Sequence, residues 1–113
     1  MNKGFVEYVL DLLSCHKGVT ARAMFGGHGV YKDGIIFALI IEGELYFKVS
    51  PSNINDYKQQ DSSPFTYQGK DKQVSMSYWR VPEHIMEDQD MLDEWMQKSI
   101  KASIESKKGQ PKK

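Results

Sequence analysis

A glycine-rich segment inside a strand-like run constrains the fold of this chain more than any other feature. Three glycines occur within four residues, at Gly26, Gly27 and Gly29, and an Asp33-Gly34 turn signal follows shortly afterwards. Glycine in a strand permits a positive φ angle and the close approach of another backbone, both of which a Cβ hinders. We therefore predict that residues 21–30 form one strand bent at the glycines, followed by a hairpin turn.

Further strand patterns follow this turn in close succession. Residues 35–41 are an apolar run without polar alternation, which is typical of a central strand covered at least partly on both faces. Residues 44–49 and 73–80 alternate between two faces, and residues 65–67 have a shorter strand pattern. Tight turns join these runs, so the pattern predicts an antiparallel sheet of about five strands.

Helix patterns flank the strands at both ends. Residues 3–16 have apolar side chains at helical spacing, and a second apolar stripe begins behind a cap at Asp88 or Asp90. Residues 50–53 have the composition of a helix start and predict one short helix behind them. We interpret the second stripe as core, with a partner interface as the alternative; it comprises Met91, Leu92, Trp95, Met96, Ile100 and Ile104. The order predicts a two-layer α+β domain, an antiparallel sheet flanked by N- and C-terminal helices and one short central helix.

The size and composition of the chain indicate one globular domain. Its 113 residues, 40% hydrophobic and 12% aromatic, suffice for a core, and its single cysteine suits a reducing compartment. No secretory signal pattern opens it, and its longest apolar run, residues 35–41, is far shorter than a membrane span. We therefore expect a cytoplasmic protein that does not enter a membrane, with a domain at residues 1–106 and a basic, disordered tail at residues 107–113.

The charge balance limits the class of partner. The 15 basic and 15 acidic residues cancel, and the pI is near 6.8, whereas domains that bind duplex DNA usually have a pI above about 9. The only dense basic run is Lys107–Lys113, which we interpret as a solvated terminus, with weak nucleic-acid contact as the alternative. Any nucleic acid is therefore expected to bind weakly and through this tail.

The glycine-rich segment is also a candidate anion site, because backbone N–H groups in glycine-rich turns bind phosphate. However, it lacks both the helix that the dinucleotide fingerprint requires and the Gly-Lys-Ser/Thr ending of the phosphate loop. A bend in a strand is the favoured interpretation, and a ligand-facing role is the alternative. Arg22 and Arg80, at strand ends, are candidates for gripping an anion or for pairing with a carboxylate such as Glu83 or Asp93.

Histidine and cysteine residues are candidates for metal binding. Cys15 and His16 are adjacent, so their side chains diverge on a helix. Neither they nor His28 and His84 have the paired spacing of a structural zinc site. We expect no metal, no other cofactor and no cysteine nucleophile.

Aromatic residues are candidates for nucleic-acid recognition. Trp79 stands beside Arg80, and Tyr31 and Tyr46 occur in other strands. Sheet-face nucleic-acid binders stack bases on such rings. The helices need a sheet face to pack on, however, so we interpret most of these rings as core.

Several segments together resemble a known bacterial family. The most specific is Thr20–Tyr31, which contains Arg22-Ala23-Met24-Phe25-Gly26-Gly27-His28-Gly29. Supporting segments are residues 34–38, 45–49, 64–67 and 76–82, together with Leu92 and Trp95. Over residues 12–104, the chain resembles the N-terminal domain of the TfoX/Sxy family of bacterial competence regulators.

The resemblance implies an α+β domain that takes part, as a transcriptional coactivator, in switching on DNA-uptake genes. It implies no catalytic residues. Full-length members carry a second, helical C-terminal domain, so we expect this chain to be a stand-alone first domain. His28 stands where the family commonly has an aromatic or a small residue.

Together, the residues and the resemblance predict a non-enzymatic regulatory module that binds a protein of the transcription machinery, as a monomer or homodimer. The expected binding residues are Arg22, Met24, Phe25, Gly26, Gly27, Gly29, Tyr31, Trp79 and Arg80. The alternative is a small-ligand or anion-binding domain, with or without enzymatic activity, built on Arg22, the Gly26–Gly29 bend and Arg80.

Overall fold

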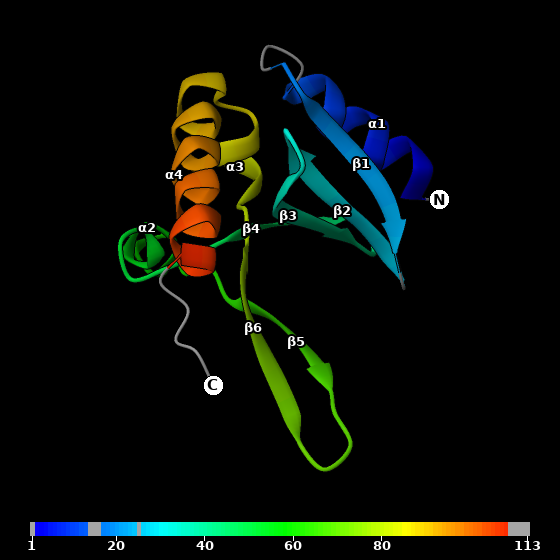
Figure 1. Ribbon diagram of the computed structural model, residues 1–113, viewed down its shortest axis with the longest axis vertical. Coiled ribbons are helices and arrows are strands. Elements are labelled where there is room, and N and C mark those ends of the chain that lie inside the picture. Colours follow the sequence, from blue (N-terminus) through cyan, green and yellow to red (C-terminus); the bar gives the residue numbers. More distant parts are fainter. Residues whose placement is uncertain (1, 14–16, 25, 109–113) are drawn as a thin grey trace.

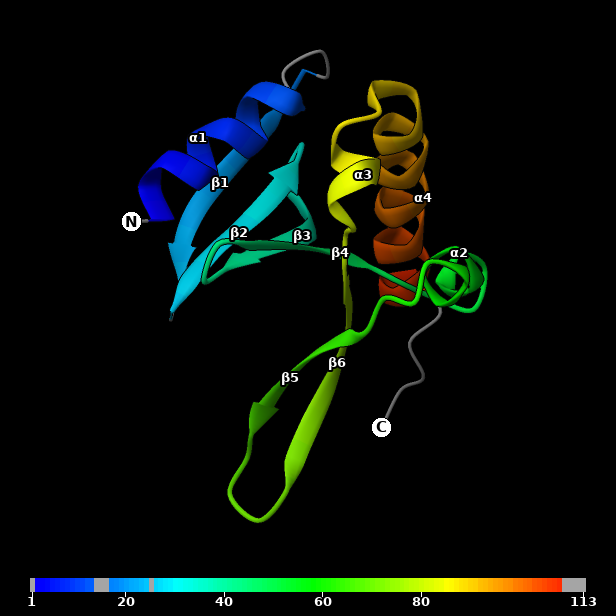
Figure 2. The same ribbon diagram turned by 180° about the vertical axis from the view of Figure 1, so that it is seen from behind.

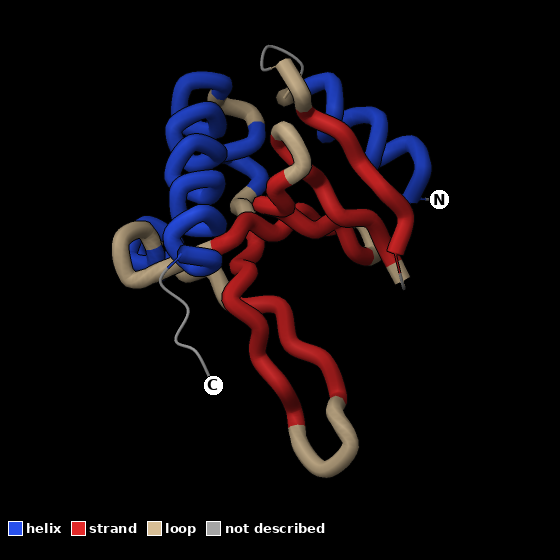
Figure 3. The backbone as a smooth tube through the Cα atoms, in the orientation of Figure 1, coloured by secondary structure: helices blue, strands red, loops and turns tan. Residues whose placement is uncertain are grey.

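Four helices and six strands make up the computed structural model, which describes residues 2–13, 17–24 and 26–108 (Figure 1). Their order along the chain is α1 (Asn2–Leu12), β1 (Val19–Met24), β2 (Gly27–Lys32), β3 (Ile35–Ile41), β4 (Glu44–Lys48), α2 (Ile54–Gln59), β5 (Pro64–Gln68), β6 (Gln73–Arg80), α3 (Glu83–Met86) and α4 (Gln89–Lys108). Figure 3 shows the β5–β6 hairpin projecting away from the helices. The predicted α+β class is confirmed.

The strands form one antiparallel sheet in the order β1-β2-β3-β4-β6-β5. Two of its hairpins turn at Asp33-Gly34, with φ angles of 52° and 86°, and at Glu42-Gly43, with φ angles of 52° and 76°. Two consecutive positive φ angles are typical of type I′ turns, whose twist matches that of the flanking strands. The predicted Asp33-Gly34 hairpin and the antiparallel arrangement are confirmed.

The prediction of a single bent strand over residues 21–30 is wrong. This segment contains most of β1 and the first half of β2, and these strands pair antiparallel from Met24 and Gly27 to Val19 and Lys32. Gly26, with a φ of +75°, lies between them in a backbone region that glycine enters without a Cβ penalty. A hairpin therefore takes the place of the expected bend, and the sheet has six strands rather than about five.

One face of the sheet forms the hydrophobic core with the helices (Figures 1 and 2). The cross-strand neighbours Val30, Ala38 and Phe47 are all 0% exposed in this core. A register shift at Val30/Tyr31 marks a bulge, and adjacent residues at a bulge can face the same side. Phe37 and Ala38 both enter the core in this way, which explains why β3 shows no simple alternation.

The apolar stripe of α4 faces the core, as predicted. Leu92, Trp95 and Met96 are at most 3% exposed. Tyr57 of α2 packs on this stripe with its ring centroid 4.3 Å from that of Trp95, and its hydroxyl lies 3.4 Å from Ser99 Oγ. Burial raises the pKa of the Tyr57 phenol well above its ordinary value, so the hydroxyl stays protonated inside the core.

Local side-chain hydrogen bonds mark where the helices begin. The Met91 backbone N–H donates to Asp88 Oδ1 at 3.2 Å, so the first of the two predicted caps is the one that α4 uses. Before α2, the Ser50 N–H donates to Asn53 Oδ1 at 2.7 Å, and Asn53 Nδ2 donates to the Lys48 carbonyl at 3.2 Å. The buried Asn53 thereby connects the end of β4 to the start of α2.

The first and last helices lie near the limits of the described chain. Helix α1 ends at Leu12 and Leu13 follows in a turn, so the helix is shorter than the predicted 3–16; Cys15 and His16 lie outside the described residues. Helix α4 continues to Lys108, and residues 109–113 of the basic tail also lie outside them. No helix within the described part of the chain is long and apolar enough to cross a membrane.

Candidate functional site

The described helices pack against one face of the sheet and form the core with it. We call the opposite face of the sheet the open face. Residues directly opposite one another in antiparallel strands project from the same face. The strand pairings place one residue from each of five strands in a single row, namely Arg22, Gly29, Leu39, Tyr46 and Arg80. These residues and those packed beside them define the open face: Met24, Tyr31, Ile36, Lys48, Phe65, Tyr67 and Tyr78.

Within the described residues, five aromatic rings lie on the open face. The ring centroids of Tyr46 and Phe65 are 5.2 Å apart in an edge-on arrangement, and those of Phe65 and Tyr67 are 6.3 Å apart and stacked at 27°. Burial raises the pKa of the Tyr78 phenol on this face. Tyr67 is 46% exposed. The rings therefore extend from the β5–β6 hairpin to the middle of the sheet.

Three cations accompany the rings. Lys48 Nζ donates to Ser77 Oγ at 2.6 Å and lies 5.3 Å from the ring centroid of Tyr78, and burial lowers the pKa of this lysine. Arg22 is exposed and Arg80 half-buried. Within the described residues neither arginine forms an ion pair, so the carboxylate pairing that the sequence left open is not found there.

The middle of the open face is packed by its own side chains. Leu39 is only 6% exposed, although it does not belong to the core under the helices. A Cβ built on Gly29 would meet Ile36 Cδ1 at 3.0 Å, and Met24 Sδ and Tyr31 Cε1 at 3.2 Å each. The missing side chain at Gly29 therefore lets three neighbours close over the centre of the sheet.

At Gly27, a backbone atom of the neighbouring strand leaves no room for a Cβ. A Cβ at this position would overlap the carbonyl oxygen of Ile40 in the adjacent strand β3. The prediction that glycine here permits the close approach of another backbone is confirmed at this residue. The neighbour is a strand of the same sheet.

The structure separates the predicted site residues into three groups. Six of them lie on the open-face side of β1, β2 and β6: Arg22, Met24, Gly27, Gly29, Tyr31 and Arg80. Trp79 instead packs against the core, opposite Phe47 and Pro64. Gly26 lies between β1 and β2, and Phe25 lies outside the described residues.

Arg22 and Arg80 occupy the two ends of the row of five. Neighbouring strands are about 4.8 Å apart, so four strand spacings separate the two backbones by roughly 19 Å along the sheet. The pairing Arg22↔Gly29 places one arginine beside the glycines, while Arg80 pairs with Tyr46. The two backbones are too far apart to form one compact anion pocket, whereas a partner that spans the sheet can contact both arginines.

The histidines of the described chain do not converge. His84 Nε2 lies 2.8 Å from Gln60 Oε1, and His28 Nδ1 is buried without a hydrogen-bond partner. No group of three or more His, Cys, Asp or Glu residues suited to a metal ion occurs among residues 2–13, 17–24 and 26–108. Cys15 and His16 lie outside these ranges, so for them the expectation of no metal stays a prediction.

Sequence reasoning missed several members of the open face, namely Lys48, Phe65, Tyr67 and Tyr78. The alternation of residues 44–49 and 73–80 separates the two faces of each strand correctly. It does not tell which face the helices cover. That information comes only from the packing of α1 to α4.

Comparison with known proteins agrees with the resemblance seen in the sequence. The chain is 26% identical to Protein Sxy of Escherichia coli (strain K12) over 86 residues, which are 76% of this chain and 41% of that protein. It therefore spans less than half the length of this relative. The family model of the TfoX N-terminal domain matches residues 11–103, close to the 12–104 expected. The chain thus belongs to the TfoX N-terminal domain family.

Proposed function

We propose that this chain is a non-enzymatic, cytoplasmic regulatory domain that acts by binding a protein of the transcription machinery. Its membership of the TfoX N-terminal domain family supports a competence-regulator-like role. The family resemblance brings no catalytic residues with it. Binding is therefore the activity that we assign to the domain.

The observation that carries this proposal is the chemistry of the open face over β1, β2 and β3. It presents an exposed arginine, Arg22, beside the half-buried Met24, Tyr31 and Ile36. Arginine, tyrosine and methionine are enriched in the centres of protein interfaces, where a ring or guanidinium is desolvated by the partner. Arg22 has no ion pair within the described residues, which leaves its five N–H donors available to a partner.

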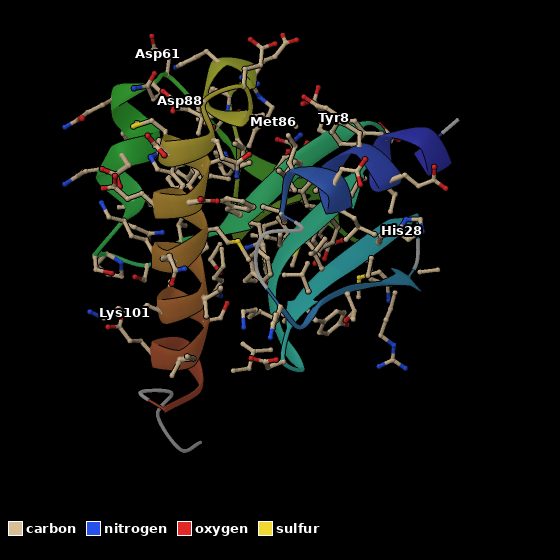
Figure 4. All side chains as sticks on the ribbon, turned by 90° about the horizontal axis from the view of Figure 1, so that it is seen from above. Tyr8, His28, Asp61, Met86, Asp88 and Lys101 are labelled. Carbon is tan, nitrogen blue, oxygen red and sulfur yellow. The ribbon has the colours of Figure 1, made fainter. Side chains whose placement is uncertain are left out.

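Capture from native lysate, followed by quantitative mass spectrometry, tests the proposal. Arg22→Glu reverses the charge of the arginine on this surface, and Lys101→Glu makes the same change on α4 as a matched control. Figure 4 shows Lys101 on α4, far from His28 on β2. We expect the unmodified chain and Lys101→Glu to capture the same protein equally well, and Arg22→Glu to capture at least about tenfold less of it. Interface arginines often contribute 2 kcal/mol or more to binding, and about 1.4 kcal/mol corresponds to a factor of ten in affinity.

Two results would contradict the proposal. One is the absence of any enriched protein across growth states. The other is an identical set of captured proteins for Arg22→Glu and the unmodified chain. Circular dichroism of each variant, compared with the unmodified chain, shows whether a loss of capture reflects a loss of fold.

A further inference from the structure

The β5–β6 hairpin, residues 64–80, extends beyond the helices in both views of the ribbon (Figures 1 and 2). Thr66, Tyr67, Ser75 and Ser77 of this hairpin are exposed. Tyr67 and Tyr8 are the large hydrophobic residues that the described part of the chain leaves exposed, at 46% and 44%. An aromatic ring on a projecting ribbon contributes nothing to the core under the helices, so its exposure calls for another explanation.

Tyr67 does not stand alone. It stacks on Phe65 with ring centroids 6.3 Å apart, and Phe65 contacts Tyr46 at 5.2 Å. The three rings form a continuous strip from the hairpin onto β4, and none of them belongs to the core that the helices share with the sheet. Strips of aromatic side chains on a sheet are the surfaces on which successive unpaired bases stack.

The charge of the hairpin differs from that of the whole chain. Residues 64–80 contain three cations, Lys70, Lys72 and Arg80, and one acid, Asp71, so their net charge is 3 − 1 = +2, whereas the chain is neutral. Lys70 and Lys72 are exposed at the tip, and Arg80 pairs with Tyr46 at the base of the hairpin. Cations therefore lie at both ends of the aromatic strip, and at the Tyr46 end Glu44 and Glu42 accompany Arg80.

We propose that this strip binds single-stranded nucleic acid. Bases stack on Tyr46, Phe65 and Tyr67, while phosphates lie near Lys70, Lys72 and Arg80. The rings favour an unpaired strand over a duplex, because the neighbouring base pairs cover the faces of each base inside a duplex. The few cations predict modest affinity and little sequence preference.

This inference is independent of the protein-binding function proposed above, since it uses β4, β5 and β6 instead of β1 to β3. It also differs from the expectation that nucleic acid binds only through the basic tail. The observation behind it is the coincidence of exposed stacked rings with local positive charge. Stacked rings fit the faces of unpaired bases and the local cations fit phosphates, so nucleic acid is the occupant that the hairpin favours.

Fluorescence anisotropy of a labelled, short oligothymidylate titrated with the full-length chain tests the proposal. The variant is Tyr67→Ala, and the matched control is Tyr8→Ala, which removes a ring of nearly the same exposure from α1. Base–aromatic stacking contributes about 1–3 kcal/mol per base, so we expect Tyr67→Ala to bind roughly 5- to 150-fold more weakly and Tyr8→Ala to bind as the unmodified chain does.

The charged groups are tested in the same assay. Replacing Lys70 and Lys72 by glutamine is expected to make the slope of log affinity against log salt shallower by about 1.4, because each phosphate contact to a single strand contributes about 0.7. Replacing the four lysines of residues 107–113 by glutamine in the full chain is expected to leave most of the binding intact. A duplex of the same length is expected to bind more weakly than the single strand.

Several results would overturn the proposal. They are the absence of binding at about 100 μM protein and low salt, equal affinities for Tyr67→Ala and Tyr8→Ala, or complete loss of binding in the tail variant alone. If the oligonucleotide does not bind but Tyr67→Ala abolishes capture of a protein from lysate, the hairpin is a protein site. Urea midpoints for all variants show whether each one is folded.

Discussion

The two faces of the sheet are built from the same strands, yet they differ in what covers them. On the core face, Phe37 and Phe47 are 0% exposed beneath the helices. On the open face, Leu39 is shielded by neighbouring open-face side chains, and Tyr46 stays half-buried. Both faces are rich in apolar residues. The comparison teaches that the composition of a strand shows which of its faces are apolar. Whether an apolar face becomes buried in the core depends on where the helices pack.

The largest expected difference concerns two adjacent residues of β4. Phe47→Ala empties a site in the core and should lower the free energy of unfolding by about 3–5 kcal/mol. Tyr46→Ala removes a cross-strand partner from the open face and should cost about 1 kcal/mol. Urea denaturation of both variants measures the two effects. Equal costs would mean that the open face is packed as tightly as the core.

The next difference compares two glycines of β2. Gly27→Ala directs a methyl group at a backbone carbonyl, which cannot move away, and should cost about 1–3 kcal/mol. Gly29→Ala meets mainly the ends of the flexible Met24 and Ile36 side chains, so we expect a smaller loss. Thermal melts followed by circular dichroism give the ranking. An inverted ranking would show that the side chains over Gly29 are the more rigid obstacle.

Alkaline pH should affect the core phenol more than the open-face phenols. Burial raises the pKa of Tyr57 above its ordinary value of 10.0, so above pH 10 the unfolded chain loses this proton first. The free energy of unfolding should therefore be insensitive to this group below pH 10 and should fall above it, by at most about 1.4 kcal/mol per pH unit. Urea titrations at neutral pH and above pH 10 measure this slope.

Conservative variants separate the contributions of the two faces. Tyr57→Phe should make the decrease of the free energy of unfolding with alkaline pH shallower. Burial also raises the pKa of the Tyr46 phenol, but this ring is only partly buried, so Tyr46→Phe should change that slope less. An unchanged slope in Tyr57→Phe would show that this phenol does not titrate differently in the folded and unfolded states.

The smallest expected effect concerns charge on the helix side of the molecule. Lys98 Nζ lies 2.9 Å from Asp56 Oδ2 and 3.5 Å from Glu94 Oε2, and the hydrogen bond to Asp56 raises the pKa of Lys98. These side chains are partly exposed, so a double-mutant cycle with Lys98→Met and Asp56→Asn should give a coupling of about 0.2–1 kcal/mol that shrinks in high salt.

The same measurement on the open face should differ. Arg80 has no ion pair within the described residues, so the cost of Arg80→Met should be nearly independent of salt. A strongly salt-dependent cost at Arg80 would reveal an attraction to a carboxylate that the geometry does not show.

The coupling between Lys98 and Asp56 also depends on pH. It is fully present just below pH 10.5, the ordinary pKa of lysine, and should be lost as the pH rises through the elevated pKa of Lys98.

Local sequence signals predicted much of the fold. The Asp33-Gly34 dipeptide alone predicts the hairpin turn, since both residues adopt positive φ angles there. The alternation of residues 73–80 predicted β6 with its observed bounds. The prediction failed at residues 21–30, because a glycine permits a bend and a reversal equally well. Pairing of β2 with both β1 and β3 selects the reversal at Gly26, and that pairing involves residues distant in the sequence.

The sequence by itself determined the turns, the periodicity of the strands and the apolar stripe of α4, because these depend on backbone freedom and on spacing within one segment. Only the tertiary structure decided which face of the sheet became the core. Trp79 and Arg80 are neighbours, yet packing of the helices places the first against the core and leaves the second on the open face. The physical reason is that both faces of β6 carry large side chains, and the face that is buried in the core is the one that the helices can reach.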